Sequence, residues 1–407
     1  MLYRLRDEGF RGYLVGGGVR DLLLGKTPKD YDISTDARPG QLRKIFKNSR
    51  VIGRRFRLVQ VFFKGGKIIE VSTLRSKSEY DLDEEDEVLP SNNTYGTLAE
   101  DAFRRDLTIN SLFYEIENFT VIDYTGGMDD IRNGIIRVVG DADRRIHRDP
   151  VRLIRAIRHA SRTGFKIEPN TWDAIRKHMH MLDICPVSRI RDELFKDMRS
   201  AASAAWFLLA WRSGLFVYLF PCYRDLAQNK NSDAAREQLE KIFSIIDRLV
   251  AGQQRLPEHF ILALILLPWA KAERGLMQSP IKGNEGFQYA RKLRNVIGEN
   301  FIHLNLKRAI KESMTGLLAN VPLFEKHKAT QNWPKWLKRK SYFDDSLVFY
   351  KLFQEIEGGK KVARLDLQGA APAGKAVDHQ LRKNRKKGKR KPAFAGKRTS
   401  VFGLKKR

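Results

Sequence analysis

The chain has 407 residues, a formal net charge of +28 and a pI of about 10.1. Its length predicts roughly two to four domains, and the positive excess favours a polyanionic partner, through the release of counterions from phosphates. The two cysteines, Cys185 and Cys222, lack the paired spacing of zinc ligands or of a disulfide framework, which argues against both.

A glycine turn follows the first predicted strand, which ends at residues 14–15. Gly16 and Gly17 let backbone N–H groups approach an anion closely, because glycine has no Cβ. Residues 19–24 are predicted to form a short helix whose positive N-terminus faces the same place, and Arg20 supplies a charged donor for phosphate oxygens. The turn predicts a phosphate site; the alternative is a glycine-rich hairpin with a surface arginine.

Two aspartates lie on the next predicted strand, residues 29–35. Side chains at i and i+2 of a strand project from one face, which places Asp30 beside Asp32. Adjacent carboxylates repel unless a cation lies between them, and their oxygens suit Mg²⁺. Two Mg²⁺ ions can activate a 3′-hydroxyl and stabilise a leaving pyrophosphate. A D-x-D pair alone is more often two solvated turn acids, but the nearby glycine turn favours the metal site.

A third acid is available on the predicted strand of residues 68–75. Glu70 lies between Ile69 and Val71 and therefore faces opposite to them. It can point to the metal site while its neighbours pack inward, or it can be a solvent-facing strand residue. The sequence supports these two alternatives equally.

A polar segment follows at residues 100–112. Asp106 and Asn110 lie one helical turn apart, a spacing at which side chains meet. Such a pair can hold a ribose hydroxyl or brace an arginine against a triphosphate. The alternative is an exposed helix with a local Arg–Asp pair.

Four motifs occur in an order that resembles the class II nucleotidyltransferases, the family of bacterial poly(A) polymerases and CCA-adding tRNA nucleotidyltransferases. They are residues 16–21, the D-x-D pair, residues 104–110 and residues 123–130, and the resemblance covers more than half of the chain. It implies an α+β fold, with a small mixed-sheet nucleotidyltransferase head followed by helical neck, body and tail. It also implies that Asp30 and Asp32 bind the catalytic Mg²⁺, that Asp106 is a functional aspartate and that Arg105 holds the nucleotide.

The neck motif of the family is E-D-x-x-R, whereas residues 148–152 here are Arg-Asp-Pro-Val-Arg. The first of them, Arg148, reverses the charge of the family's glutamate. Asp149 and Arg152 are retained and lie on one helix face. Arg155 and Arg158, on the following turn, are counted with them as nucleotide-binding candidates.

The chemistry of Asp149 and Arg152 indicates which base they accept. Adenine and cytosine each present an exocyclic amine beside a ring nitrogen, so that an aspartate accepts from the amine while an arginine donates to the ring nitrogen. Guanine and uracil present the reverse pattern. The pair should therefore select ATP or CTP; the alternative is an i,i+3 surface ion pair.

Two segments bear on the choice within the family. Residues 51–61 closely resemble a stretch characteristic of bacterial poly(A) polymerases, although taken alone they describe only a basic strand edge. Residues 186–196 are similar to the family's helix-turn element, in which an arginine and a glutamate one turn apart brace the neck.

A basic arm ends the chain, since no acid follows Asp378. Such a segment repels itself and lacks apolar residues, which predicts a disordered RNA-binding arm. Poly(A) polymerases of the family tend to carry a basic tail, and compact CCA-adding enzymes often lack one. The alternative is a general electrostatic patch for ribosomes or membrane surfaces. The RNA-binding candidates are Arg382, Lys383, Arg385, Lys386, Lys387, Lys389, Arg390 and Lys391.

The remaining chain is predicted to be helical, including residues 201–211 and 239–250. The apolar run of residues 260–267, stopped by Pro268, is far shorter than the roughly twenty residues of a membrane span and is predicted to be a buried body helix. The aromatic residues among lysines at residues 333–343 either stack on single-stranded RNA or pack in the core. No signal peptide is visible, so we expect a cytoplasmic protein without a membrane partner.

We assign domains by residue number. They are the head at 1–125, the neck at 126–197, the body at 198–300, the RNA-binding tail at 301–378 and the arm at 379–407. The chain opens inside the helix before the glycine turn, so we expect that its start is truncated or misassigned.

These observations predict a template-independent poly(A) polymerase that uses ATP and two Mg²⁺ ions to extend the 3′ ends of mRNA, small RNA or tRNA. A CCA-adding enzyme, which shares every catalytic residue named, is the alternative. A non-catalytic RNA-binding protein of the same fold is more remote, because Asp30 and Asp32 are intact. An aminoglycoside-type nucleotidyltransferase would not need the basic arm.

Overall fold

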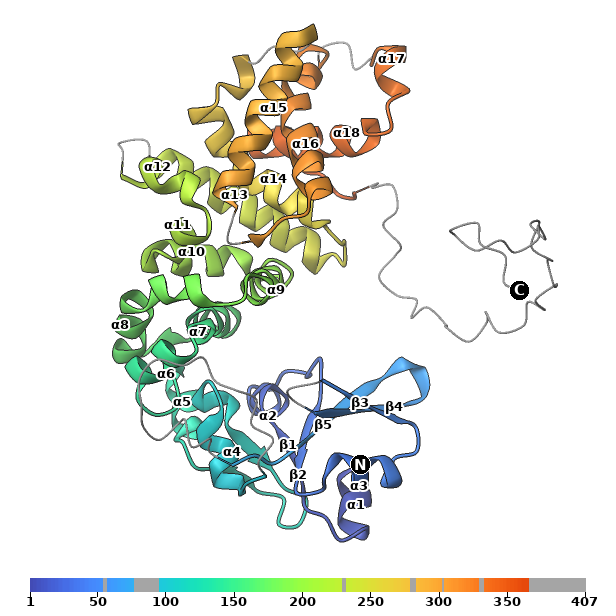
Figure 1. Ribbon diagram of the computed structural model, residues 1–407, viewed down its shortest axis with the longest axis vertical. Helices are drawn as coiled ribbons and strands as arrows, with labels where there is room; N and C mark the ends of the chain where they lie inside the picture. Colours follow the sequence, from blue (N-terminus) through green and yellow to red (C-terminus); the bar gives the residue numbers. More distant parts are fainter. Residues whose placement is uncertain are drawn as a thin grey trace, which may run out of the picture. The chain divides into compact units, whose positions relative to one another are not determined.

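The computed structural model describes residues 1–53, 57–76, 95–228, 232–278, 283–301, 304–328 and 333–365, all within one compact unit of residues 1–371. Among these residues, a mixed sheet of seven strands occupies the N-terminal part (Figure 1). Its strands are β1 (Gly12–Val15), β2 (Asp32–Thr35), β3 (Ser49–Ile52), β4 (Leu58–Phe62), β5 (Ile68–Thr73), β6 (Leu112–Tyr114) and β7 (Val121–Asp123). The accompanying helices are α1 (Leu2–Asp7), α2 (Gly17–Leu23), α3 (Pro39–Ile45) and α4 (Leu98–Arg104), with the 3₁₀ helices η1 (Lys64–Gly66) and η3 (Thr108–Asn110).

The sheet has one acidic face and one apolar face. Its strand order is β3-β4-β5-β2-β1-β6-β7, with β2 and β5 parallel and the other neighbouring pairs antiparallel. The parallel register sets Asp32 opposite Glu70 and Ile33 opposite Val71. Because side chains alternate along a strand, the two carboxylates share one face. Ile33 and Val71 share the other face, where they join a buried cluster with Leu5.

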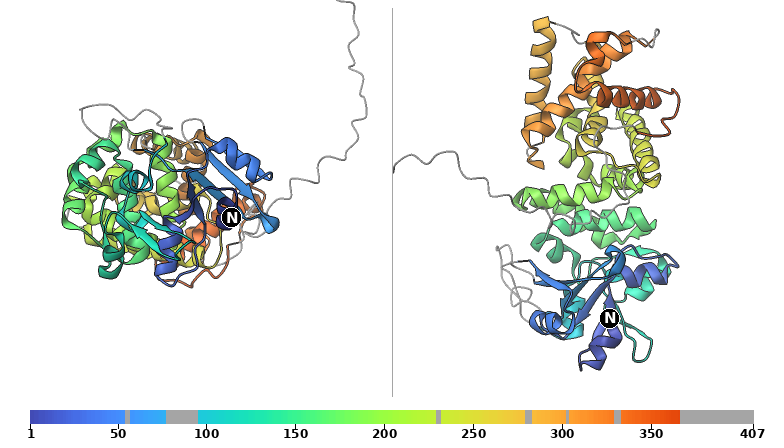
Figure 2. Two further views of the ribbon diagram at one scale, coloured as in Figure 1. Left: turned by 90° about the horizontal axis from the view of Figure 1, so that it is seen from below. Right: turned by 90° about the vertical axis from the view of Figure 1, so that its right-hand side faces the viewer.

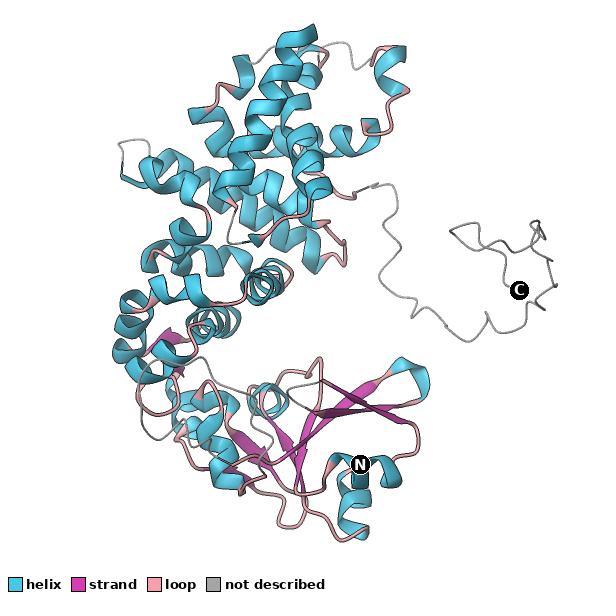
Figure 3. Ribbon diagram, viewed as in Figure 1, coloured by secondary structure: helices cyan, strands magenta, loops and turns pink. Residues whose placement is uncertain are grey.

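Helices make up almost all of the described chain after the head (Figure 3). They are α5 (Gly127–Asn133), α6 (Ala142–Arg148), α7 (Val151–Thr163), α8 (Pro169–Lys177), α9 (Val187–Met198), α10 (Ser203–Ser213), α11 (Leu215–Leu219), α12 (Arg224–Gln228), α13 (Ser232–Ala251), α14 (Glu258–Glu273), α15 (Gly283–Asn300), α16 (Arg308–Lys326), α17 (Lys335–Lys338) and α18 (Phe343–Ile356). The 3₁₀ helices η4 (Met179–Ile184), η5 (Pro221–Tyr223) and η6 (Leu276–Gln278) lie between them. The expected α+β class is confirmed, but the neck is not purely helical, because β8 (Ile135–Ile136) and β9 (Lys166–Ile167) pair in parallel.

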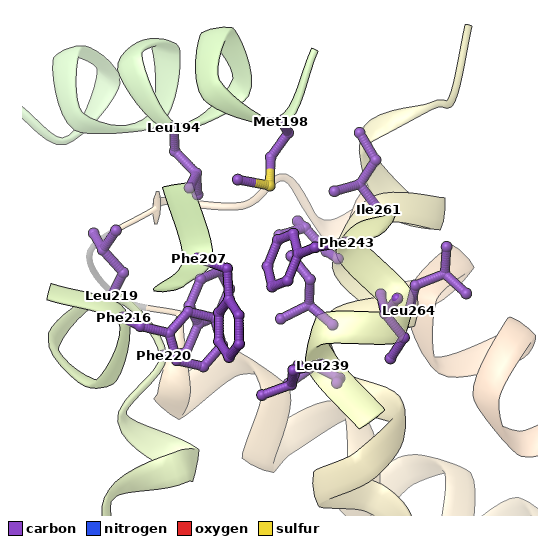
Figure 4. Packing of buried hydrophobic residues seen from close by; sticks show 14 of the residues in the cluster. Leu194, Met198, Phe207, Phe216, Leu219, Phe220, Leu239, Phe243, Ile261 and Leu264 are labelled. Carbon is purple, nitrogen blue, oxygen red and sulfur yellow. The ribbon is translucent and has the colours of Figure 1, made fainter. Parts of the chain in front are cut away.

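One hydrophobic cluster runs through the helical part, from Leu107 to Ile356. The right-hand view of Figure 2 shows the same division from another side, with most of the sheet in blue and the helices after it in green to red. At the centre of the cluster, Phe207 stacks on Phe243 with 4.8 Å between ring centroids and meets Phe216 edge-on at 4.9 Å (Figure 4). The predicted helices over residues 201–211 and 239–250 are α10 and α13, which supply Phe207 and Phe243, while Phe216 comes from α11.

The expectation that Pro268 stops the apolar helix is wrong. α14 continues through Pro268, which lies inside the helix. The hydroxyl of Tyr223 accepts a hydrogen bond from the backbone N–H of Trp269 at 3.3 Å and donates to the carbonyl of Ile265. These are the two groups that an uninterrupted helix would join directly. A side chain from a distant segment thus restores the bond beside the proline and lets the helix continue.

The aromatic residues near the end of the described chain divide into two groups. Trp333 packs on Phe324, with 4.9 Å between ring centroids, and Phe343 is buried. Trp336 and Tyr342 are exposed. Core packing therefore accounts for two of the four.

Three predicted features concern residues outside the described ranges: residues 54–56 of the poly(A) polymerase-like stretch, most of the acidic segment before residue 95, and the basic arm. Within the described ranges, no helix has both the length and the apolar content that crossing a bilayer requires.

Candidate active site

A cavity of about 470 Å³ lies between the acidic face of the sheet, the segment after α4 and the start of α7. Charged and polar side chains dominate its walls. It is lined by Val15, Asp32, Leu58, Glu70, Ser72, Arg75, Asp101, Arg104, Arg105, Asp106, Asn110, Asp149, Arg152 and Arg155. Eight of the residues that the sequence singled out therefore meet at one place.

Asp32 and Glu70 form the acidic wall of the cavity, side by side on β2 and β5. Gln60 on β4 donates a hydrogen bond to Glu70, with 3.0 Å between Nε2 and Oε1. Desolvation raises the pKa of Asp32, and the negative charges of Glu70 and Asp30 raise it further. A carboxylate whose neighbours disfavour its ionisation is suited to a cation.

Asp30 lies just before β2, so the strand expected over residues 29–35 begins only at Asp32. The backbone of Asp30 still passes against α2 here: a Cβ built on Gly18 would lie 3.5 Å from its carbonyl oxygen. Asp30 is exposed and does not line the cavity. Its charge nevertheless acts on Asp32.

The acids fit a magnesium ion that protein and substrate hold jointly. Within the described ranges, no three His, Cys, Asp or Glu side chains come together as a complete metal site. Mg²⁺ is usually bound by one or two carboxylates together with water and substrate phosphates, so a complete protein cage is not required. The mutual repulsion around Asp32 is the feature that favours such an ion.

The glycine turn lies against an arginine of the cavity. Gly16 has φ +68° at the start of α2, a conformation that favours glycine. A Cβ built on Gly16 would lie 3.3 Å from Nη1 of Arg105. The expected short helix is confirmed as α2, but Arg20 does not line the cavity. Its buried guanidinium instead donates to Asn110 Oδ1 at 2.7 Å.

Arg105 is held by three contacts at the edge of the cavity. Its Nη2 donates to Asp101 Oδ2 at 2.9 Å and to Ser34 Oγ at 3.2 Å. Its guanidinium lies over the ring of Phe113, 4.8 Å from the centroid. These contacts hold the positively charged guanidinium of Arg105 in place, facing the acidic wall.

Asp106 and Asn110 do not share an α-helix as expected, because α4 ends before them and Asn110 belongs to η3. They still meet, with 3.4 Å between Asn110 Nδ2 and Asp106 Oδ1. Burial would raise the pKa of Asp106, but the positive charges of Arg155 and Arg152 and the hydrogen bond from Asn110 lower it below its ordinary value. The cavity therefore holds a stable carboxylate here.

Asp149 and Arg152 form the neck wall. Arg189 of α9 pairs with Asp149 at 2.9 Å, and Arg152 lies 3.7 Å from the same carboxylate. Arg152 also donates to the carbonyl oxygen of Arg105 at 3.2 Å. The two side chains are only 13% and 19% exposed, so an ordinary surface ion pair does not describe them.

Arg155 links the cavity to the neck. One nitrogen of its guanidinium lies 3.6 Å from Asp106 Oδ2, and another lies 3.4 Å from Glu193 Oε1. It lines the cavity beside Arg152. Arg189 and Glu193, one turn apart on α9, thus both contact residues around α7, as the helix-turn element led us to expect.

Arg158 lies apart from the other nucleotide-binding candidates. Its guanidinium is buried, bonds to Glu193 and Asp197, and does not line the cavity. At about 100° per residue, Arg158 is turned away from the stripe that begins at Arg152. Its position assigns it to the packing of α7 on α9.

The chain is similar to known proteins in both its head and the helical segment after it. Residues 12–137 match the family model of the poly A polymerase head domain, and residues 164–226 match the model described as the probable RNA and SrmB-binding site of polymerase A. The chain is 40% identical over 271 residues to poly(A) polymerase I of Escherichia coli O6:H1, which covers 65% of this chain and 58% of that protein. The chain belongs to the class II nucleotidyltransferase family.

A second branch of the family is also similar. The CCA-adding enzyme of Lactobacillus helveticus is 39% identical over 197 residues, 48% of each protein. The solved structure of the Bacillus stearothermophilus CCA-adding enzyme in complex with CTP has a TM-score of 0.58 and 25% identity, and covers 88% of this chain and 80% of that one. The match to the poly(A) polymerase spans less than two thirds of that relative's length.

Four residues of the site were missed in the sequence. Asp101, Arg75 and Arg104 line the cavity, and His159 of α7 contacts the cavity residue Asn110. Asp101 could have been found as an acid one turn before Arg105 on a predicted helix. For His159, the signal was its spacing of two turns from Arg152.

Proposed function

We propose that this chain is a template-independent poly(A) polymerase, which transfers AMP from ATP to the 3′ end of RNA. The observation that supports it most is that one cavity is lined both by Asp32 and Glu70 and by Asp149 and Arg152. A nucleoside triphosphate has its reacting phosphates at one end and its base at the other. One cavity can thus hold both ends.

At the phosphate end, Asp30, Asp32 and Glu70 would hold two Mg²⁺ ions. Bound there, the ions would neutralise developing charge and favour ionisation of the 3′-hydroxyl. Gly17 presents a backbone N–H at the start of α2, whereas that of Gly16 donates to the carbonyl of Leu112. Arg105 presents a guanidinium fixed by the contacts described above. In the reaction, the 3′-oxygen bonds to the α-phosphorus as the bond to pyrophosphate breaks, and no protein nucleophile is needed.

At the base end, Asp149 accepts from the exocyclic amine of adenine and Arg152 donates to the ring nitrogen. Arg189 fixes the aspartate, and the carbonyl of Arg105 fixes the arginine. Asp106 and Arg155, which lie 3.6 Å apart and line the same cavity, are assigned to the ribose. The arrangement accepts adenine and cytosine, so it does not itself distinguish ATP from CTP.

The choice of poly(A) addition rests on two further observations. At nearly equal identity, the similarity to poly(A) polymerase I extends over 65% of the chain, compared with 48% for the CCA-adding enzyme. The basic arm also suits RNA without a defined fold, which body, tail and arm together would hold. CCA addition is the second candidate, because the fold extends over most of a CCA-adding enzyme.

One assay separates these functions. The protein is incubated with Mg²⁺ and either an unstructured oligonucleotide or a tRNA transcript that lacks its CCA end, with ATP alone, with CTP alone or with both. We expect long adenylate tracts on the oligonucleotide from ATP alone, and none from an Asp30→Ala variant. Addition of C, C and A to the tRNA followed by arrest would establish the CCA-adding enzyme instead. If the protein adds nucleotides to neither RNA, the result would favour the non-catalytic RNA-binding protein.

A further inference from the structure

A hydrogen-bonded junction joins three segments behind the cavity: α2, the loop around η3, and α7. Arg20 of α2 donates to Asn110 Oδ1 at 2.7 Å, and the same nitrogen lies 3.0 Å from Nδ1 of His159. Asn110 Nδ2 lies 3.4 Å from Asp106 Oδ1 and 3.3 Å from His159 Nε2. The glycine turn, the cavity loop and the neck helix therefore meet at one imidazole.

The chemistry of the junction defines the form of the imidazole. An arginine can only donate, so the Nδ1 atom that faces Arg20 must be the unprotonated, accepting nitrogen. The proton then lies on Nε2, where the Asn110 Nδ2 at 3.3 Å is itself a donor, so this second contact is one of packing and Arg20 provides the hydrogen bond to the ring. Burial, and the positive charge of Arg20, lower the pKa of His159 to about 3, so the ring is neutral near pH 7. A protonated ring would place a second cation against Arg20.

Helical spacing connects this junction to base recognition. His159 follows Arg152 by seven residues, close to two turns of α7, and follows Arg155 by four. The three side chains therefore occupy one stripe of the helix, which faces the head. Contacts that hold His159 against α2 and Asn110 therefore also hold Arg152 and Arg155 in position relative to Asp106.

We propose that His159 is a positioning residue, whose neutral imidazole sets the spacing between the glycine turn that holds the phosphates and the neck helix that reads the base. It contacts neither end of the nucleotide and acts through Arg20 and Asn110. The inference rests on the proposed use of the cavity for a nucleoside triphosphate. It adds that ATP recognition depends on a histidine that does not line the cavity but contacts the cavity residue Asn110.

Two substitutions in the full chain test this role. His159→Phe keeps the volume of the ring and removes both nitrogens, and His159→Asn keeps an acceptor where Nδ1 faces Arg20. An error in placement of about 1 Å can cost up to about 100-fold in rate. We expect His159→Phe to raise the KM for ATP about 10-fold and to weaken the preference for ATP over GTP. His159→Asn should recover most of both, and neither variant should change the KM for RNA.

The KM separates positioning from folding, because a smaller folded fraction lowers the apparent kcat but leaves the KM unchanged. His180→Phe, at an exposed histidine of η4, is the matched control and should behave as the wild type. Wild-type values of the KM for ATP and of base preference in His159→Phe would overturn the proposal. Equal defects in the Phe and Asn variants would also overturn it, since the acceptor would then be irrelevant.

Calorimetric titration with ATP distinguishes failure of this inference from failure of the proposed function. If the wild type binds ATP but extends no RNA, polymerase activity is disproved and the dissociation constants of the two variants decide the role of His159. A weaker affinity in His159→Phe, restored in His159→Asn, would then support positioning, and equal affinities would overturn it. A wild-type protein that binds no nucleotide would overturn both.

Discussion

The two walls of the cavity differ in how their charges are balanced. On the sheet wall, Asp32 and Glu70 stand side by side, with Gln60 rather than a cation as the hydrogen-bond partner of Glu70. On the neck wall each acid faces an arginine: Asp149 pairs with Arg189 at 2.9 Å, and Asp106 lies 3.6 Å from Arg155. Arg105 offsets only part of the unfavourable charge on the sheet wall, because the pKa of Asp32 is still raised, whereas the acids of the neck wall are already paired.

This difference separates two tasks. A compensated wall keeps its geometry before substrate arrives, which suits recognition of a base by fixed donors and acceptors. An uncompensated wall stores unfavourable electrostatic energy that a cation relieves, which suits a metal that arrives with the triphosphate. Substitutions on the sheet wall should therefore affect chemistry more than stability. Substitutions in the neck should affect stability or selectivity more than chemistry.

The largest effect is expected from Asp32→Asn. This change removes a proposed metal ligand, and we expect nucleotide addition to fall by at least about 1,000-fold, which corresponds to roughly 4 kcal/mol in the barrier. The melting temperature without metal should not fall, because the repulsion with Glu70 is relieved. Radiolabelled AMP incorporation and thermal unfolding in EDTA measure the two effects. Asp173→Asn, at an exposed residue of α8, is the control.

An Asp32→Asn variant that unfolds at a much lower temperature would contradict this contrast, because Asp32 would then stabilise the fold. An active variant would remove Asp32 from the metal site.

In the neck, Arg158→Met should produce the largest loss of stability. The substitution leaves Glu193 and Asp197 buried without the cation that bonds to both. Breaking a buried ion pair costs about 3–5 kcal/mol. Urea unfolding would measure this loss, with Arg176→Met on the exposed side of α8 as a control expected within about 0.5 kcal/mol of the wild type. If Arg158→Met instead raised the KM for ATP without lowering the stability, Arg158 would belong to the nucleotide site.

Base selectivity should respond to Asp149→Asn. The amide presents a donor where the carboxylate accepted, so the preference for ATP over GTP should fall by about 1–3 kcal/mol, or roughly 5-fold to 150-fold. Competition between the two nucleotides in one addition assay measures this ratio. Asp129→Asn is the matched control, because its partner Arg132 and Asp129 itself are both about 70% exposed and away from the cavity. Unchanged selectivity in Asp149→Asn would place base recognition elsewhere.

Local features of the site could be predicted from the sequence because each depends on neighbours in the chain. The turn at Gly16, the helix after it and the inward packing of Val71 beside Glu70 follow from spacing and side-chain type. The strand through Asp30 was predicted too long, because its start depends on the passage of the chain beneath α2.

Features that join distant segments could not be predicted in this way. The contact of His159 with Arg20 spans 139 positions, and the hydrogen bond from Tyr223 to the carbonyl of Ile265 in α14 spans 42. Arg158 was grouped with Arg155 by proximity along the helix, although the partners that decide its role are on α9. Spacing shows which side chains share a face; only tertiary packing shows what that face meets.

The smallest expected effect is a pH dependence on the sheet wall without metal. The pKa of Asp32 in the folded protein is above its ordinary value of 3.8, because desolvation and the charges of Glu70 and Asp30 disfavour ionisation. The folded state therefore holds this proton more tightly than the unfolded chain does. The resulting stabilisation is complete below pH 3.8 and is lost as the pH rises through the raised value.

Melting temperatures of the wild type and of Asp32→Asn in EDTA, measured from about pH 4 to pH 7, test this sign. Other titrating groups act in both proteins, so the difference between the two curves isolates Asp32. We expect the melting temperature of the variant to rise relative to that of the wild type as the pH rises. Mg²⁺ with ATP should stabilise the wild type more at the upper end of this range. A difference that stays constant with pH would mean that Glu70 and Asp30 do not oppose the ionisation of Asp32. The sheet wall would then be as well compensated as the neck wall, and its charge would no longer single it out as the place where a cation binds.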